Sequence, residues 1–300
     1  MSNPKVRVYK DEALSLGIEP RPNQRGRSNT EYRLDSTQQE NLKELRKHKK
    51  IKRLFFDIET SPMVVYSWRT GWKINIHTDN IIQDWKIICI SYKWEGSDKV
   101  QTLKWDKNKC DKKLLQEFIK IANLSDEMVA HNGDRFDIKK IRTRCIFHRI
   151  PTFPKYRTLD TLKKAKSGFN FNSNRLDYIA KFLGVGAKLK HEGFPMWVKC
   201  MQGDKQALKD MTEYCEMDII VLEDVYNALE PYILNNTHAG TLQGGFKHEC
   251  PTCGGEDAVL LKNAFTAKGT IKRVMECDTC EYVYEISNAD YRLKTEFKKL

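Results

Sequence analysis

The stretch RLFFDIETSP, residues 53–62, decides the fold of this 300-residue chain. It begins as a buried β-strand, but the same strand also carries two acids, Asp57 and Glu59. Residues i and i+2 of a strand point to the same side of a sheet, so both carboxylates share one face. Burying unpaired carboxylates is costly. A divalent cation would offset that cost, and carboxylate oxygens suit Mg²⁺ or Mn²⁺. The alternative is an exposed strand end with two solvated acids.

Composition indicates a soluble globular protein with a polyanionic partner. Hydrophobic residues make up 40% and charged residues 31% of the chain. No segment approaches the ~18 apolar residues of a membrane helix, and the N-terminus lacks an apolar signal-peptide core. We therefore expect a cytoplasmic location and no membrane association. Residues 1–53 hold 14 Lys/Arg against 7 Asp/Glu, a net +7 of the total +12. This basic balance favours nucleic acid, although it also fits a solvated surface.

Two further acidic motifs follow the first. In AHNGDRFD, residues 130–137, a strand runs into Gly133, which permits a tight bend, and Asp137 begins the next helix. In YCEMD, Tyr214 and Asp218 are spaced i, i+4, which places both on one side of a helix. Each motif has a plainer interpretation: Asp137 as a helix cap, Tyr214 as a core residue and Asp218 as a solvated acid.

Taken in order, DIET, HNGDRFD and YCEMD resemble the three motifs of the DnaQ-like (DEDD, DEDDy subclass) 3′–5′ exonucleases. YCEMD and SNRLDYIAKFLGVGAK resemble the proofreading domain of family B DNA polymerases, and the chain is similar to stand-alone phage and bacterial exonucleases. The resemblance spans about residues 51–232 and implies an RNase H-like fold. If the protein is phage-encoded, its expected location is the host cytoplasm.

The resemblance also implies roles for individual residues. Asp57, Glu59, Asp137 and Asp218 match the ligands of two catalytic Mg²⁺ or Mn²⁺ ions. Tyr214 matches the residue that orients the attacking water. Supporting, substrate-binding positions are Asn132 and Phe136.

The expected activity is metal-dependent 3′–5′ hydrolysis of nucleic acid, with single-stranded DNA as the foremost substrate, by a two-metal-ion mechanism. An RNase or a structure-specific endonuclease on the same scaffold is one alternative. Another is a replication accessory protein that binds nucleic acid and whose nuclease is vestigial. The four acids argue against a vestigial site.

Two CxxC pairs predict a second metal site. Cys250, Cys253, Cys277 and Cys280 form a Cys₄ set that suits one structural Zn²⁺, as in a zinc ribbon. Redox dithiols or free thiols are the alternatives. The ribbon would contact nucleic acid or a replication or repair protein. The other five cysteines read as ordinary thiols.

The chain is expected to contain four segments. These are a basic N-terminal arm with a helix (1–50), an RNase H-like exonuclease domain (51–234), a linker (235–247) and a Cys₄ zinc ribbon (248–300). Within the arm, residues 20–33 read as loop or disorder, and Thr37 with Glu40 fits a capping box. The fold class is α/β, a mixed five-stranded sheet flanked by helices.

Several residues keep two interpretations. Asp160 is either a strand-end acid or a support of the metal site. His131 and His191 are expected to be structural. Trp68 and Trp72 lie near Arg69 and Lys73, so they either stack on unpaired bases or pack in the core.

Overall fold

The computed structural model describes residues 5–19, 29–47, 51–71, 73–151, 156–187, 189, 192–233, 237–242 and 245–297. The chain forms two compact units. One joins Met1–Ile51 to Asn235–Leu300, and the other is Lys52–Leu234. Among the described residues, no helix has both the length and the apolar character that a membrane span requires.

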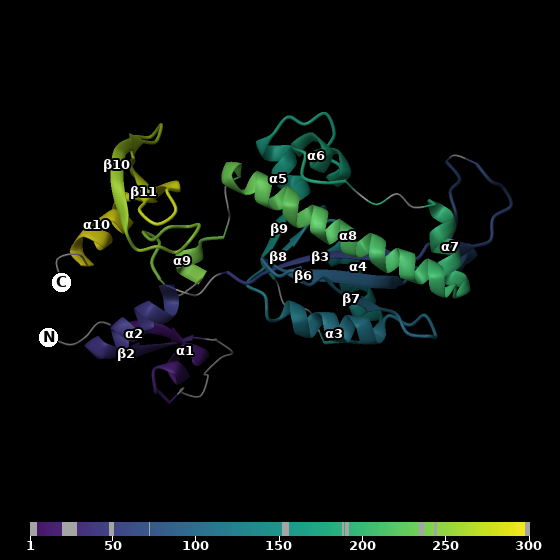
Figure 1. The fold of residues 1–300 in the computed structure, drawn as a ribbon, viewed down its shortest axis with the longest axis horizontal. Coiled ribbons are helices and arrows are strands. Elements are labelled where there is room, and N and C mark those ends of the chain that lie inside the picture. The colour runs from purple at the N-terminus through teal and green to yellow at the C-terminus, as the bar shows by residue number, and fades with distance from the viewer. Residues whose placement is uncertain are drawn as a thin grey trace. The chain divides into compact units, whose positions relative to one another are not determined.

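The unit Lys52–Leu234 is built on a mixed five-stranded sheet, as predicted (Figure 1). Its strands stand in the order β7-β6-β3-β8-β9, with β3 antiparallel to β6 and parallel to β8. The strands are β3 (Arg53–Thr60), β6 (Ile87–Trp94), β7 (Gln101–Lys104), β8 (Glu127–Ala130) and β9 (Thr158–Asp160). A separate two-stranded sheet pairs β4 (Val64–Val65) with β5 (Ile81–Gln83).

Helices flank this sheet. They are α3 (Lys112–Ala122), α4 (Asp137–Phe147), α5 (Thr161–Gly168), α6 (Leu176–Leu183), α7 (Phe194–Gln202) and α8 (Lys205–Leu229), with short 3₁₀ turns η1 (Thr78–Asn80) and η2 (Glu230–Tyr232). The sequence pattern predicts α3, α4, α6 and α8. It does not predict α5 or α7.

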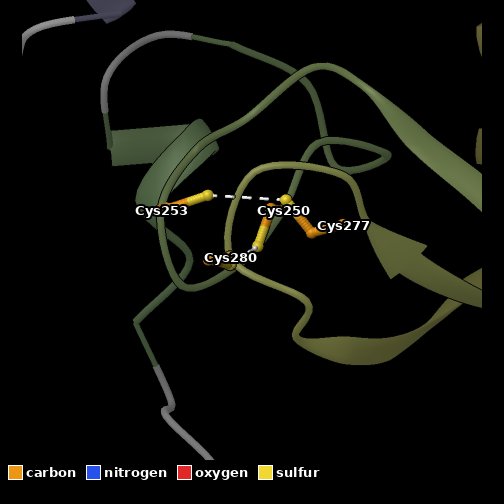
Figure 2. A group of neighbouring side chains, drawn as sticks. All are labelled: Cys250, Cys253, Cys277 and Cys280. Carbon is orange, nitrogen blue, oxygen red and sulfur yellow. Dashed lines mark hydrogen bonds between the residues drawn. The ribbon is translucent and has the colours of Figure 1, made fainter.

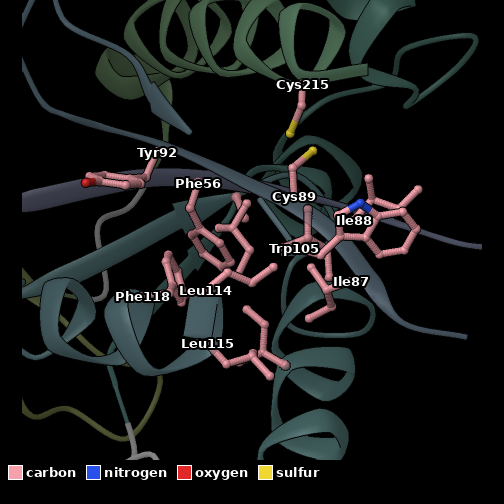
Figure 3. Close-up of a cluster of buried hydrophobic side chains, with 14 of the residues drawn as sticks. Phe56, Ile87, Ile88, Cys89, Tyr92, Trp105, Leu114, Leu115, Phe118 and Cys215 are labelled. Atoms are coloured by element: carbon pink, nitrogen blue, oxygen red, sulfur yellow. The ribbon is translucent and has the colours of Figure 1, made fainter. Parts of the chain in front are cut away.

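Strand β3 distributes its side chains to two opposite cores. Phe55 packs edge-on against Tyr226 of α8, with ring centroids 5.4 Å apart. Its neighbour Phe56 packs against Phe118 of α3 at 5.5 Å, within the cluster drawn in Figure 3. Because side chains alternate along a strand, Asp57 and Glu59 share the face of Phe55 and point to the α8 side.

The other unit contains two small sheets. In its N-terminal part, β1 (Lys5–Tyr9) pairs antiparallel with β2 (Asn29–Arg33), accompanied by α1 (Lys10–Ser15) and α2 (Ser36–Lys47). In its C-terminal part, three antiparallel strands are accompanied by two helices: β10 (Ala258–Phe265), β11 (Ile271–Cys277), β12 (Val283–Ser287), α9 (Ala239–Leu242) and α10 (Asn288–Phe297). Helix α9 falls within the segment 235–247, and its Ala239 N–H donates to the Pro251 carbonyl at 2.7 Å.

Two expectations for the N-terminal arm are wrong. Residues 29–33 form a strand rather than loop, because pairing with β1 satisfies their backbone groups; residues 20–28 lie outside the described ranges. The capping box of α2 is Asp35 with Gln38, not Thr37 with Glu40. The Gln38 N–H donates to Asp35 Oδ1 at 2.7 Å, and the Asp35 N–H donates to Gln38 Oε1 at 3.2 Å.

A buried ion pair fixes α4 to the start of α3. The Asp111 carboxylate is fully buried and accepts two hydrogen bonds from Arg144, at 2.7 and 2.8 Å. It also bonds the Ile87 N–H at 3.0 Å and His148 Nε2 at 2.6 Å. Burial opposes its ionised form, but these donors hold the pKa of Asp111 below its usual value. Cys110 lies beside Asp111 and His148, but Arg144 occupies the carboxylate, so we interpret this group as structural.

We predict that Arg144→Met lowers the free energy of unfolding by about 3–5 kcal/mol, because it leaves the Asp111 charge buried without its main partner. Arg142→Met, at an exposed position of the same helix, should change it by less than about 0.5 kcal/mol. Urea unfolding of the two variants measures both values. Equal effects would show that Asp111 does not depend on Arg144.

Candidate metal centre

Three of the four predicted acidic ligands meet between β3 and α8. One carboxylate oxygen each from Asp57, Glu59 and Asp218 lie within 4.8 Å of one another. Asp57 and Glu59 are half-buried at the end of β3, whereas Asp218 is buried on α8. Ligands of one octahedral Mg²⁺ stand about 3.0 to 4.2 Å apart, so small side-chain rotations would let these oxygens share an ion.

Asp137 lies at the first residue of α4 and reaches the same place. Its Oδ1 accepts a hydrogen bond from the backbone N–H of Ile58, the residue between Asp57 and Glu59, at 3.2 Å. Burial, followed by repulsion from Asp57, raises the pKa of Asp137 well above its usual value. A cation bound beside Asp137 would favour the ionised form of its carboxyl.

Gly133 makes the approach of Asp137 possible. A Cβ at this position would overlap the Cβ of Ala130 and lie 3.8 Å from Asp137 Oδ2. The preceding residue, Asn132, has φ of 68°, a left-handed conformation that asparagine tolerates better than most residues. Its carbonyl accepts the Phe136 N–H at 3.0 Å, which turns the chain directly from β8 into α4.

Asp160 organises this turn from the neighbouring strand. Its carboxylate accepts the N–H groups of Asn132 at 2.9 Å and Asp134 at 3.4 Å. It also caps α5 by accepting those of Leu162 at 3.0 Å and Lys163 at 3.3 Å. Asp160 is therefore more than a strand-end acid: it holds the loop that carries Asp137.

Two thiols lie beside the acids of β3, at Asp57 and opposite Glu59, and no sequence pattern indicated their role. Cys215 Sγ is 3.7 Å from both the carbonyl oxygen and Oδ2 of Asp57. Cys89, opposite Glu59 in the β3–β6 register, points toward Cys215 (Figure 3). Burial, followed by contact with Cys89 and the nearby acids, raises the pKa of Cys215 well above its usual value. The Cys215 thiol is thus a neutral neighbour of the acids.

Tyr214 and Asn132 line a cavity of about 850 Å³. Tyr214 packs edge-on against Trp197, with ring centroids 6.4 Å apart. The lining also contains Lys166, Arg175 and Lys181, and Asp177 pairs with Lys181 at 2.7 Å, which leaves the cavity with a net positive charge. The cavity is therefore suited to a polar, anionic ligand next to the predicted water-orienting residue.

The other described residues singled out from the sequence lie outside the group of acids. Phe136 is substantially exposed. His131 bonds Thr161 Oγ1 and the Asn174 carbonyl, both at 2.9 Å, which agrees with a structural role. Trp68 is fully exposed rather than packed in the core. Trp72 and His191 lie outside the described residues.

The four cysteines of the two CxxC pairs converge on one point (Figure 2). Their sulfur atoms lie within 4.8 Å of one another, and the pairs Cys250–Cys280 and Cys253–Cys277 are each 3.6 Å apart. Backbone N–H groups of Gly255 and Thr279 donate to Cys253 Sγ and Cys277 Sγ at 3.3 and 3.4 Å. This set of donors could hold a thiophilic metal ion.

A comparison with protein-family models agrees with the fold. A family model described as RNase_H superfamily matches residues 74–230, which include Asp137, Tyr214 and Asp218 but begin after Asp57 and Glu59. No curated protein matches the chain. Among solved structures, the family B DNA polymerase from the hyperthermophilic archaeon Pyrobaculum calidifontis is similar, with 16% identity and a TM-score of 0.46. That match covers 61% of this chain and only 25% of the polymerase chain.

We predict that Asp137→Asn stabilises the metal-free protein near neutral pH. Because the pKa of Asp137 is raised in the folded state, the protonated carboxyl contributes its whole share of the free energy of unfolding below the ordinary carboxyl pKa. That contribution is lost as the pH rises from there through the folded-state pKa. An amide does not ionise, so the gain should grow with pH across that window. A gain of 1 kcal/mol would raise the thermal midpoint by about 2–4 °C.

Asp134→Asn is the matched control, because Asp134 lies in the same loop but pairs with the exposed Lys163. It should leave the midpoint nearly unchanged. Thermal unfolding in EDTA at several pH values measures both variants. A lower midpoint for Asp137→Asn would show that the ionised carboxylate stabilises the fold by itself.

Proposed function

Because the chain belongs to the RNase_H superfamily, we propose that it is a metal-dependent 3′–5′ exonuclease whose preferred substrate is single-stranded DNA. The observation that carries this proposal is the convergence of Asp57, Glu59 and Asp218 within 4.8 Å, with Asp137 bonded to the backbone between the first two. The 3′–5′ direction and the DNA preference rest on the resemblance of the DIET, HNGDRFD and YCEMD motifs to those of the DnaQ-like exonucleases.

The acids would hold Mg²⁺ or Mn²⁺, since all their ligand atoms are hard oxygens. Two such ions would neutralise the charge of the scissile phosphate and activate the attacking water. Without them the four carboxylates would repel the phosphate. The raised pKa of buried Asp137 fits a site whose charge is balanced by a cation.

Tyr214 would orient the attacking water. Its ring is held by Trp197, and it lies one helical turn before Asp218 on α8. A phenol ordinarily titrates near pH ~10, so it suits positioning water better than deprotonating it. The metal ligands, rather than Tyr214, would then account for most of the rate enhancement.

The cavity beside Tyr214 would receive the terminal nucleotides. Asn132 lines it and offers an amide to the sugar or base, while Lys166 and Arg175 would balance the charge of phosphates. Phe136, one residue before Asp137, would pack against a base.

We predict that the protein shortens 5′-labelled single-stranded DNA stepwise in Mg²⁺ or Mn²⁺ and that EDTA abolishes this activity. Asp57→Ala and Asp218→Ala should reduce the rate at least about a thousandfold, because each removes a ligand of the transition-state ions. Tyr214→Phe should retain more activity than either. Product ladders on sequencing gels measure the rates for single-stranded DNA, duplex DNA and RNA.

The exposed acid Asp79 provides a control, since Asp79→Ala should digest DNA at the wild-type rate. Wild-type rates from Asp57→Ala would contradict the assignment. A single internal cut would indicate a structure-specific endonuclease, and preferential digestion of RNA would indicate an RNase. Binding without cleavage would favour an accessory protein.

We also propose that the four cysteines hold one structural Zn²⁺. A tetrahedral zinc with Zn–S bonds of about 2.3 Å places its sulfurs about 3.8 Å apart, near the 3.6 Å of Cys250–Cys280 and Cys253–Cys277. The N–H donors to Cys253 and Cys277 fit thiolate ligands. Four protein ligands leave no open position, so this ion would stabilise the strands β10–β12 rather than take part in catalysis.

We predict one zinc per chain by mass spectrometry of the purified protein. Cys277→Ser should lose that zinc and destabilise the C-terminal sheet, because metal binding and folding are coupled in small metal-stapled units. Cys110→Ser, near Asp111 and His148, should retain the full zinc content. If Cys110→Ser lost the zinc instead, the ion would be bound by the group Cys110, Asp111 and His148, and the four-cysteine proposal would be wrong.

A further inference from the structure

The β4–β5 hairpin carries aromatic side chains that nothing in the described structure covers. Trp68 is 100% exposed and Tyr66 is 73% exposed. Val64 and Ile82, from the two paired strands, are also exposed. One hairpin thus presents four large apolar side chains to solvent, an arrangement that suits the binding of a partner.

The base of this hairpin is fixed to the end of β3. Ser61 and Lys86 bond each other twice: the Ser61 N–H donates to the Lys86 carbonyl at 2.8 Å, and the Lys86 N–H donates to Ser61 Oγ at 3.0 Å. Ser61 is only two residues beyond Glu59. Six residues then separate Ser61 from Trp68, so their Cα atoms are seven steps along the chain and at most about 25 Å apart. The exposed rings are therefore within the reach of a strand bound at the acids.

Further aromatic residues lie at the base of the hairpin. Lys140 Nζ stands 3.6 Å from the Trp85 ring centroid and 5.4 Å from that of Phe136. Trp85 immediately precedes Lys86, and Phe136 immediately precedes Asp137. Rings and a cation thus connect the surroundings of Asp137 with the base of the hairpin.

The charges favour a nucleic-acid strand over another apolar surface. Arg69 directly follows Trp68, and residues 52–234 carry 31 Lys/Arg against 24 Asp/Glu, a net +7 despite the acidic cluster. A single strand offers both flat bases for the rings and phosphates for the cations. A protein partner with an apolar face would use the rings but not the positive charge.

We propose that Tyr66 and Trp68 stack on unpaired bases of the strand whose end lies at the acids, as a second contact outside the metal centre. This inference rests on the proposed function in taking nucleic acid as the ligand and the acids as the place where the strand ends. A strand too short to extend from the acids to the hairpin would not make this contact.

The test is binding of labelled single-stranded DNA of about 20 nucleotides, measured by fluorescence anisotropy with Ca²⁺ in place of Mg²⁺, and a gel run after each measurement verifies that the strand is uncut. Trp68→Ala should weaken binding about 5- to 100-fold, which is the range for loss of one or two stacked bases. Trp68→Phe should restore most of the affinity because it retains a ring. Tyr232→Ala is the matched control: Tyr232 is 77% exposed on η2 and should have no effect.

Strand length gives the second comparison. An unlabelled strand of about three nucleotides, measured by competition, should bind wild type and Trp68→Ala equally. Equal weakening of both lengths would place Trp68 in the terminal-nucleotide site and overturn the proposal. Unchanged binding of the long strand would also overturn it. So would a loss of self-association in sedimentation without a loss of DNA binding, which would identify a second copy as the occupant.

The binding assay separates this inference from the exonuclease proposal. Trp68-dependent binding by a protein that cleaves no DNA in Mg²⁺ or Mn²⁺ would uphold the hairpin contact and refute the exonuclease. Metal-dependent digestion of DNA, together with DNA binding that does not depend on Trp68, would uphold the exonuclease and refute the hairpin contact.

Discussion

The packing of α8 against β3 is the constraint on which the acidic site depends. Phe55 meets Tyr226 at one end of this contact, and Asp57 with Glu59 meets Asp218 at the other. Eight helical residues from Asp218 to Tyr226 rise about 12 Å, and four strand residues from Phe55 to Glu59 extend about 13 Å. The two lengths match, so the aromatic contact sets the register in which the acids meet. A change of that register would separate the acids even if every ligand were retained.

The fourth acid depends on a different set of interactions. Asp137 belongs to neither β3 nor α8, and it reaches the site only because the chain turns sharply at Asn132 and Gly133. Asp160 binds two N–H groups of that turn and two of the α5 N-terminus with one carboxylate. The position of Asp137 is therefore coupled to β9, a strand that contributes no ligand. Burial of Asp137 and its repulsion from Asp57 and Asp160 oppose ionisation of this carboxyl, and a bound cation would offset both effects.

The sequence predicts those features that arise from local spacing. Alternation along residues 53–60 places two acids on one face, and the five-stranded mixed sheet follows from the order of strands and helices. The convergence of Cys250 with Cys280 was expected from the two CxxC pairs. Contacts between distant segments were not predictable, since no local pattern reveals that Asp160 reaches Asn132. The same limit applies to the strand at residues 29–33, which exists only because it pairs with β1.

Cys215 shows how a residue with no recognisable signal can shape the site. Helix α8 must approach β3 and β6 closely for Asp218 to reach Asp57, so the side chains between them must be small. Cys215 and Cys89 fill this space, and both are fully buried. A thiol is a weak donor, so Cys215 beside Asp57 satisfies little of the charge on that carboxylate. A lysine or arginine there would neutralise the acid and compete with a metal ion, whereas the thiol leaves the negative charge available to bind one.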